Sequence, residues 1–241
     1  MIKNFIMRLL FLHRGTSNSY IKYLRKKGCK IGVGTTFFFP RDVVVDITRP
    51  CLIDIGENVQ ITKNVSILTH GYDWSVMKGF YGEILGSAGK VKIGNNVFIG
   101  FNATILKGTT IGDNVIIGAN SLVNGDIPSN VVVAGNPARI IMTLDEYYKK
   151  RQSQQLKEAE ELFDSYYERF NTIPDEVVFR EFIYLFKKRD SKLKNDKLFN
   201  EIGSLVNNKE QTYLHMMKTH SKFDGYDEFV KYCLKKFKKN D

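Results

Sequence analysis

The sequence predicts a mainly β protein whose central part is a parallel β-helix, with a helical segment before it and a helical extension after it. Two observations lead to this fold class. An aliphatic residue recurs every six positions in the middle of the chain, and apolar residues take helical spacing beyond residue 141. A six-residue period does not match an α-helical face, but it fits a short strand followed by a tight turn. The recurring aliphatic residues are Ile93, Ile99, Ile105, Ile111, Ile117 and Val123.

The other positions of the repeat support the same arrangement. The second residue is glycine in four of the six units, and we interpret it as the residue that permits the corner. The fifth residue is small or β-branched in all six units. Three units complete one triangular coil, and stacked coils bury a ladder of Ile and Val. A less regular repeat begins at Ile31 and resumes at Ile55, so the predicted coil spans residues 29–141.

Both ends of the chain are predicted to be helical. Residues 1–28 contain the short apolar stretch "FIMRLLFLHR", which we interpret as an amphipathic helix packed on the coil, with a membrane-surface anchor as the alternative. The stretch lacks a cleavage site, and no run in the chain reaches the roughly 20 apolar residues of a spanning helix. Residues 142–241 show helical apolar spacing, and Pro174 is well placed to start a second helix over residues 177–188. This extension either covers an end or side of the coil, or docks a partner or stabilises an oligomer.

Composition and charge limit the function classes. The chain has 241 residues, 43% hydrophobic and 26% charged, which is ordinary for a globular protein. The net charge is +10, and residues 1–140 carry 16 Lys and Arg against 8 Asp and Glu. A basic surface attracts a phosphorylated cofactor or an acidic polysaccharide, and no nucleic-acid-binding motif accompanies it. Cys29, Cys51 and Cys233 show no zinc-binding or disulfide spacing, which is typical of a cytoplasmic protein.

The regular repeat breaks at His70, in "ILTHGYDWS". His70 is the only histidine of the repeat region, and it stands where a protruding loop, residues 71–90, leaves the coil. A loop beside a coil creates a concave place, and histidine is the side chain best suited to accept a proton near neutral pH. Asp73 or Asp46 would orient the imidazole.

The loop also carries aromatic side chains. Tyr72 and Trp74 follow His70 closely, and Tyr81 lies further along. Aromatic rings stack on the faces of sugars, so these three residues are candidates for binding a saccharide. The alternative for Trp74 is that it packs the loop onto the coil.

Three stretches carry a resemblance to a known family: "ILTHGYDWS", "VKIGNNVFIGFNATILKGTTIGDNVIIGANSLV" and "DIPSNVVVAGNPARII". They resemble the hexapeptide-repeat acyltransferases, in particular the galactoside, maltose and polysaccharide O-acetyltransferase branch, over residues 28–141. The resemblance implies a left-handed β-helix, usually trimeric, with active sites between subunits. It also implies transfer of an acetyl group from acetyl-CoA to a hydroxyl. The helical tail is similar to that of acyltransferases that modify bacterial surface polysaccharides.

The resemblance assigns roles to individual residues. His70 would be the general base, and the backbone N–H of Phe101 would stabilise the oxyanion by roughly 3 kcal/mol. Two departures concern the cofactor site: many relatives have Trp at the position of Phe98, and Thr-Lys-Asp at the position of Asn124-Gly125-Asp126. Arg139 either contacts the cofactor or forms a salt bridge to the tail. The cofactor-binding residues implied are Phe98, Gly100, Ala119, Asn124, Gly125 and Arg139.

Rival functions are weighed against this expectation. A γ-class carbonic anhydrase needs three histidines around zinc, and the repeat region has one, so no metal is expected. A non-catalytic scaffold would leave the histidine and its loop unexplained. N-acylation of an amino sugar nucleotide and acetylation of a xenobiotic remain open, because an amine acceptor would use the same base. The sequence therefore predicts a cytoplasmic, homotrimeric, acetyl-CoA-dependent O-acetyltransferase acting on a saccharide, with no nucleic-acid partner.

Overall fold

The computed structural model describes residues 12–237. Contacts divide the chain into two compact units, Met1–Tyr147 and Tyr148–Asp241. The predicted helix in "FIMRLLFLHR" falls largely on residues 1–11, outside the described part. The described chain begins with a short 3₁₀ helix, η1 (Leu12–Arg14), and continues into the helix α2 (Ser17–Lys27). Within the described residues, no helix is both long and apolar enough to cross a bilayer.

Helix α2 closes the first end of the coil. Thr16 and Ser19 form a capping box at its start, and Gly28, with φ of 114°, ends it in the left-handed conformation. Tyr20 and Leu24 are fully buried, and the Tyr20 ring meets the Phe37 ring edge-on at 5.1 Å. The helix therefore covers apolar side chains that the first coil would otherwise expose.

The coil consists of three sheets, and successive strands of the chain, apart from the last two, belong to the first, second and third sheet in turn. The first sheet holds β1 (Lys30–Ile31), β4 (Ile53–Ile55), β7 (Val91–Ile93) and β10 (Thr110–Ile111). The second holds β2 (Thr36–Phe37), β5 (Gln60–Ile61), β8 (Phe98–Ile99), β11 (Ile116–Ile117), β13 (Val131–Ala134) and β14 (Arg139–Thr143). The third holds β3 (Val44–Val45), β6 (Ser66–Ile67), β9 (Thr104–Ile105) and β12 (Leu122–Val123).

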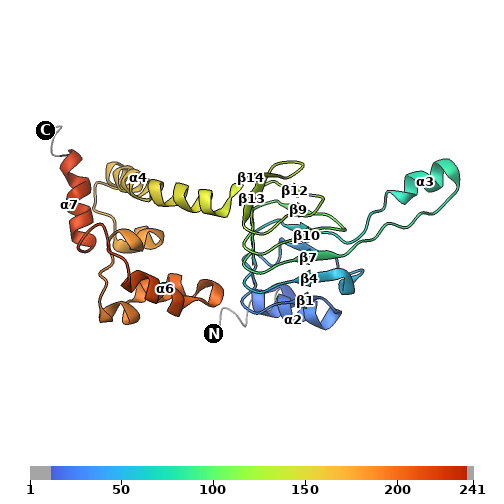
Figure 1. The fold of residues 1–241 in the computed structure, drawn as a ribbon, viewed down its shortest axis with the longest axis horizontal. Helices are drawn as coiled ribbons and strands as arrows, with labels where there is room; N and C mark the ends of the chain where they lie inside the picture. The colour runs from blue at the N-terminus through green and yellow to red at the C-terminus, as the bar shows by residue number, and fades with distance from the viewer. Residues whose placement is uncertain (1–11, 238–241) are drawn as a thin grey trace. The chain divides into compact units, whose positions relative to one another are not determined.

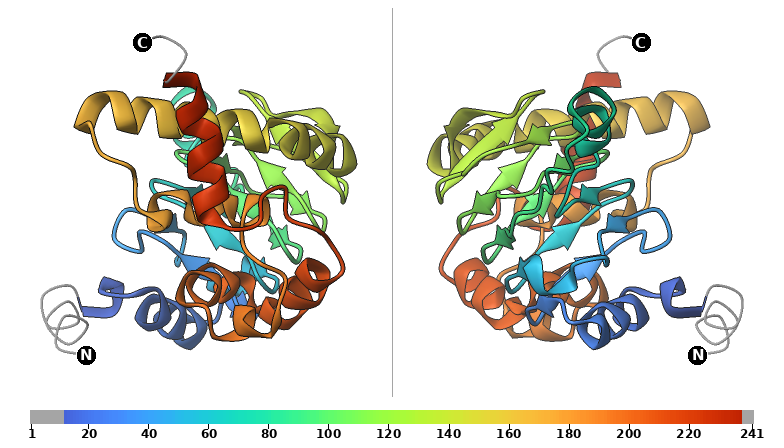
Figure 2. Two further views of the ribbon diagram at one scale, coloured as in Figure 1. Left: turned by 90° about the vertical axis from the view of Figure 1, so that its left-hand side faces the viewer. Right: turned by 90° about the vertical axis from the view of Figure 1, so that its right-hand side faces the viewer.

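This strand order makes the chain wind around three sides. Successive strands up to β12 fall in the first, second and third sheet in turn, and neighbours within a sheet are parallel. The last pair, β13 and β14, is antiparallel. Both views in Figure 2 show the strands stacked between α2 at the blue end and β14 at the yellow-green end.

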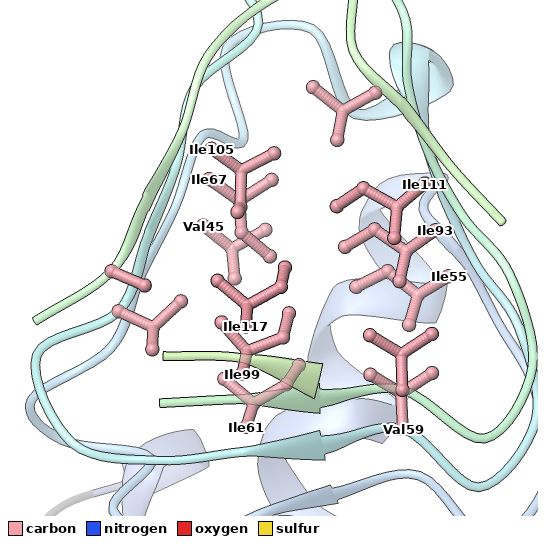
Figure 3. Close-up of a cluster of buried hydrophobic side chains, with 14 of the residues drawn as sticks. Val45, Ile55, Val59, Ile61, Ile67, Ile93, Ile99, Ile105, Ile111 and Ile117 are labelled. Atoms are coloured by element: carbon pink, nitrogen blue, oxygen red, sulfur yellow. The ribbon is translucent and has the colours of Figure 1, made fainter. Parts of the chain in front are cut away.

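Aliphatic side chains form one ladder per sheet inside the coil. Figure 3 shows Ile55, Ile93 and Ile111 above one another on the first sheet, with the other two ladders on the remaining sides. The second ladder contains Ile61, Ile99 and Ile117, and the third contains Val45, Ile67 and Ile105. The six repeat positions from Ile93 to Val123 are at most 2% exposed. The sequence-based assignment of these residues to the interior is confirmed.

The corners are formed by the fourth residue of the repeat, and it is usually asparagine. Asn96, Asn102 and Asn114 all have φ between 55° and 59°, in the left-handed region that asparagine tolerates. Their side chains also form ladders between coils: Asn96 Nδ2 donates to Asn114 Oδ1 at 2.8 Å. The same left-handed φ occurs at Asn58, Asn64 and Asn120, and at Gly34 and Gly108.

The repeat glycines have a different role from the predicted one, which was to permit the corner. Gly94 and Gly100 do not have a left-handed φ. A Cβ at Gly94 would lie 2.6 Å from the carbonyl carbon of Gly112, and one at Gly100 would lie 2.7 Å from the amide nitrogen of Ala119. These positions need glycine because the backbone of the next coil leaves no room for a Cβ.

The second unit is helical and has its own core. Buried phenylalanines at 163, 179, 186, 199 and 229 form its centre. The predicted second helix is a 3₁₀ segment instead, because Phe179 and Phe182 take non-helical backbone angles. The helices are α4 (Leu144–Phe170), η3 (Glu176–Leu185), η4 (Ser191–Asn195), α5 (Lys197–Gly203), η5 (Leu205–Asn207), α6 (Lys209–Met217) and α7 (Tyr226–Phe237).

Candidate active site

The candidate site lies at one corner of the coil, where the chain departs from its repeat. His70 is the fourth residue of the unit that begins at Ile67, so it occupies the position that asparagine takes elsewhere. Instead of turning, the chain runs outward and returns: Gly71 N donates to Ser87 O, and Gly89 N donates to Thr69 O. The excursion, residues 71–90, carries the helix α3 (Trp74–Tyr81) away from the coil (Figure 1). His70 therefore stands at the neck of this arm.

A buried carboxylate supports the imidazole. Strand β3 pairs with β6 so that Val45 lies beside Ile67, which places Asp46 one coil away from His70 and directly after the strand. His70 Nδ1 lies 2.5 Å from Asp46 Oδ2, and both side chains are almost wholly covered, at 12% and 5% exposed. The register of two parallel strands therefore brings together residues that are 24 positions apart.

Asp46 is held by four further donors. Thr48 donates through its backbone N–H at 3.0 Å and its hydroxyl at 2.6 Å to one carboxylate oxygen. Thr69 donates through its backbone N–H at 3.0 Å and its hydroxyl at 2.5 Å to Oδ2, the carboxylate oxygen that contacts His70. Burial by itself would raise the pKa of Asp46, but these hydrogen bonds outweigh it and hold the pKa well below its usual value. Asp46 is therefore ionised at neutral pH.

The ionised state of Asp46 fixes the tautomer of His70. A carboxylate can only accept hydrogen bonds, so Nδ1 of the imidazole must carry the proton that lies between them. A neutral imidazole protonated at Nδ1 has its lone pair on Nε2. The pair therefore presents a basic nitrogen, held in one orientation, at the neck of the arm.

The carboxylate that contacts the imidazole belongs to Asp46 and not to Asp73. Asp73 is exposed and stands at the N-cap position of α3, where its carbonyl accepts from Val76 N. Its carboxylate lies against Gly71, where a Cβ would collide with it. Although Asp73 is only three residues from His70 in sequence, the chain has already turned outward there, and the carboxylate beside the ring comes from the neighbouring coil.

The aromatic candidates on the arm differ in their distance from the imidazole. The Tyr72 ring meets the His70 ring edge-on, with 4.9 Å between centroids, and Trp74 in turn lies 6.2 Å from Tyr72. Tyr81 ends α3, 74% exposed, and its ring contacts Phe80. Tyr72 and Trp74 therefore lie near the imidazole of His70, whereas Tyr81 is at the outer part of the arm.

The residues expected to bind the thioester lie at a different corner within the same chain. Gly100 and Phe101 follow β8 and Ala119 follows β11, so all three lie where the second sheet turns into the third. His70 follows β6, where the third sheet turns into the first. Among the hydrogen bonds of the described residues, the amide of Phe101 donates to no acceptor. One chain thus holds the imidazole of His70 and the amide of Phe101 at separate corners.

The remaining cofactor candidates are spread over the coil. Asn124 and Gly125 follow β12 at the same corner as His70, and both are exposed. Phe98 points outward from β8, 40% exposed, and lines a small hollow with Gln60 and Asn96. Arg139 begins the edge strand β14, where its guanidinium donates to the carbonyl of Ala138. The structure does not gather these four residues around a single point of one chain.

Two residues of the site were not predicted. Thr48 and Thr69 together supply four of the five hydrogen bonds to Asp46, and the Thr48 hydroxyl also lies 3.3 Å from His70 Nδ1. An available signal was the spacing Asp46-x-Thr48, which is typical of a carboxylate that accepts from the backbone two residues on.

No metal centre accompanies the site in the part of the chain that the structure describes. Within residues 12–237, no three His, Cys, Asp or Glu side chains lie close enough together to hold an ion.

The coil of three parallel sheets agrees with one class of protein, the hexapeptide transferases. The family described as bacterial transferase hexapeptide (six repeats) matches residues 90–125. A putative acetyltransferase, YvoF of Bacillus subtilis (strain 168), is 37% identical over 153 residues, which are 62% of this chain and 81% of that protein. The chain belongs to the hexapeptide-repeat acyltransferases.

Two further relatives have names that specify an acceptor or a process. The galactoside O-acetyltransferase of Escherichia coli (strain K12) is 40% identical over 129 residues, which are 51% of this chain and 61% of that protein. A putative lipopolysaccharide biosynthesis O-acetyl transferase, WbbJ of the same strain, is 57% identical over 51 residues, 21% of this chain and 26% of that protein. The chain thus spans less than two thirds of each of these two relatives.

Proposed function

We propose that this protein transfers the acetyl group of acetyl-CoA to a hydroxyl of a saccharide destined for a cell-surface polymer. The observation that carries the proposal is the 2.5 Å hydrogen bond between His70 Nδ1 and Asp46, because it leaves Nε2 as a fixed base. A sugar hydroxyl is a weak nucleophile at neutral pH and needs such a base as it attacks.

The reaction proceeds in two proton-coupled steps. His70 Nε2 takes the hydroxyl proton while the oxygen attacks the thioester carbonyl, which gives a tetrahedral intermediate with an oxyanion. When the intermediate collapses, the carbon–sulfur bond breaks, and the imidazolium returns the proton to the CoA thiolate. Asp46 stabilises the imidazolium in between, and the amide of Phe101 is the proposed donor to the oxyanion.

Three features support a saccharide as the acceptor. Tyr72 and Trp74 offer aromatic rings beside the imidazole. The coil region carries an excess of basic residues, which suits the phosphates of CoA and an acidic polymer alike. The names of relatives include a galactoside and a lipopolysaccharide O-acetyltransferase. Cys29, Cys51 and Cys233 form no disulfide bond within the described residues, and this supports the cytoplasmic location that we propose. We also propose that the coil is left-handed.

We further propose that three copies of the chain assemble so that each active site combines two corners. His70 and Phe101 lie at different corners of one coil, so a base and an oxyanion donor can meet only if a second chain brings its corner. A three-fold arrangement closes this head-to-tail contact and gives three equal sites. Gly100 and Ala119 would then contact the pantetheine arm beside the neighbouring chain's imidazole, and Phe98, Asn124, Gly125 and Arg139 would contact the rest of CoA.

Mixed assemblies test the shared site. Two variants, His70→Ala and Ala119→Trp, are each expected to be inactive, the second because an indole would fill the pantetheine path. When the two are co-expressed and purified together, some sites combine an intact His70 corner with an intact Ala119 corner. We expect about a quarter of the wild-type rate from random mixing in a closed ring. Activity no higher than that of the single variants would show that each chain holds a whole site.

The activity itself is tested by thiol release. Purified protein, acetyl-CoA and a panel of saccharides are mixed, and free CoA is followed with a thiol reagent while the product is identified by mass spectrometry. We expect release that depends on a hydroxyl-bearing sugar. Turnover with amino sugars or other amines alone would assign N-acylation instead, and the absence of turnover with every acceptor would contradict the proposed reaction.

A further inference from the structure

The helical unit contains a pocket that has no part in the site described above. It has a volume of about 870 Å³, within the range of about 300–1,000 Å³ typical of small-molecule sites. It lies between α4, the end of η3 and α6, and every lining residue belongs to the unit Tyr148–Asp241. Nearly all the side chains that line it carry a polar group.

One wall of the pocket is a fixed aromatic ring. The Tyr184 hydroxyl lies 3.2 Å from His215 Nδ1, and the Arg189 guanidinium lies 5.2 Å from the centre of the Tyr184 ring. Arg189 also donates to the Tyr184 carbonyl at 2.9 Å. The ring is therefore held at its hydroxyl and by the arginine. Tyr148 is a second aromatic lining residue, and its hydroxyl accepts from Gln152 Nε2 at 2.9 Å. Rigid rings of this kind suit the apolar C–H face of a sugar.

The other walls offer amide groups. Gln152, Gln155, Gln211 and Asn208 line the pocket, and an amide side chain can both donate and accept, as a sugar hydroxyl does. The Gln155 Oε1 atom accepts no hydrogen bond from the residues that the structure describes. If the Gln155 side chain rotated so that Oε1 faced the pocket, a hydroxyl group of a bound ligand could donate a hydrogen bond to it.

Charge argues against a phosphorylated ligand here. Among the lining residues, all of them described, Arg151 is the only Lys or Arg. Its guanidinium is already paired with Glu158 through two hydrogen bonds of 2.7 and 2.6 Å. The phosphates of a nucleotide or of CoA would have to compete with Glu158 for this guanidinium. Aromatic rings combined with amides favour a carbohydrate.

We propose that this pocket binds an oligosaccharide segment of the polymeric acceptor. The inference rests on the proposed function, because it assumes a saccharide acceptor. A protein that binds the polymer at a second site, away from the active site, raises the local concentration of acceptor hydroxyls without changing the chemical step. The pocket would therefore affect the KM for long acceptors and not the turnover of short ones.

The experiment fills the pocket with an indole. Gln211 lies on α6 with an exposed side chain that lines the pocket, so Gln211→Trp obstructs it without entering the core. Leu214→Trp is the matched control, because Leu214 is on the same helix, is 49% exposed and does not line the pocket. Both changes are made in the full chain carrying His70→Ala. Binding is measured on an array of de-O-acetylated bacterial surface oligosaccharides, with CoA as a separate probe.

We expect Gln211→Trp to weaken glycan binding about tenfold or more and Leu214→Trp to leave it unchanged. With His70 intact, Gln211→Trp should raise the KM for a long acceptor by a similar factor and spare kcat on a monosaccharide. If Gln211→Trp misfolds by circular dichroism, Gln152→Ala combined with Asn208→Ala replaces it. Three results would overturn the inference. They are glycan binding that is unchanged in a folded pocket variant, no glycan binding by the parent chain that carries His70→Ala, and competition between CoA and the glycan for binding. If the protein with His70 intact acetylates sugars but Gln211→Trp does not affect glycan binding, only the proposed glycan site in the pocket is refuted. If Gln211→Trp abolishes glycan binding but the protein with His70 intact transfers no acetyl group, only the proposed reaction is refuted.

Discussion

Replacing His70 with alanine is expected to lower kcat/KM for acetyl transfer about a thousandfold, because general-base catalysis typically contributes about 10²–10⁴. The imidazole at the neck of the arm is the only group that we assign to accept the hydroxyl proton. His70→Gln should be equally inactive, since an amide at this position cannot serve as the base. The rate is measured by thiol release with the best acceptor found.

The same prediction has a binding control and a residue control. Acetyl-CoA binding, followed by calorimetry, should remain close to that of the wild type, because the loss concerns proton transfer. His13→Ala removes a histidine that stacks on Tyr23 near α2, and it should retain full activity. A reduction of less than tenfold in His70→Ala would contradict the assignment of the base.

Asp46→Asn is expected to lower kcat/KM by about 10³–10⁴, the scale found when the orienting carboxylate of a histidine is changed to an amide. An asparagine amide would donate to Nδ1 where the carboxylate accepts, which favours the tautomer with its proton on Nε2. With Nε2 already protonated, the imidazole cannot take the proton from the sugar hydroxyl. Asp73→Asn is the matched control, since Asp73 is exposed at the start of α3, and we expect less than about a threefold change from it.

The pH dependence distinguishes positioning from a merely structural role. If Asp46 orients the base, Asp46→Asn should keep the KM for acetyl-CoA, lower kcat and change the pH profile of kcat. A variant that raises only KM, or equal losses in Asp46→Asn and Asp73→Asn, would contradict the role of Asp46.

Acid stability provides a further readout of the same substitution. The pKa of Asp46 is lower in the folded chain than the value of about 3.9 expected when unfolded, so ionised Asp46 stabilises the fold above that pH. This contribution fades as the pH falls through the folded-state pKa. Asp46→Asn should therefore be less stable than the wild type at pH 7, and this difference should shrink in acid unfolding experiments below pH 4.

Sequence periodicity was sufficient for the coil, because its interior is specified by strict spacing. The ladder from Ile93 to Val123 is buried as the six-residue period requires. His70 could also be singled out, because it interrupts a regular pattern. Periodicity could not show that the glycines serve close stacking and that asparagines form the corners. Both residue types tolerate unusual backbone angles, and only the contact between coils separates their roles.

The orienting carboxylate was harder to predict for a physical reason. Proximity in sequence favoured Asp73, and Asp46 could be preferred only with knowledge of which strands pair. Around Asp46 the repeat is irregular, since the short 3₁₀ helix η2 (Pro50–Leu52) lies between β3 and β4 and lengthens that coil. The register of Val45 beside Ile67 is therefore not a simple multiple of six. The 3₁₀ character of η3 likewise depends on packing that the apolar spacing does not encode.

The arm leaves the coil at a corner, and the strands on either side of it still pair in register with their neighbours, Ser66 with Thr104 and Ile53 with Val91. The length and content of the excursion are thus independent of the coil's architecture. An arm of another length or composition could therefore replace this one while the His70–Asp46 pair keeps its place on the coil. Under the proposed function, we expect acceptor preference to change with the arm as a modular trait, separately from the His70–Asp46 pair.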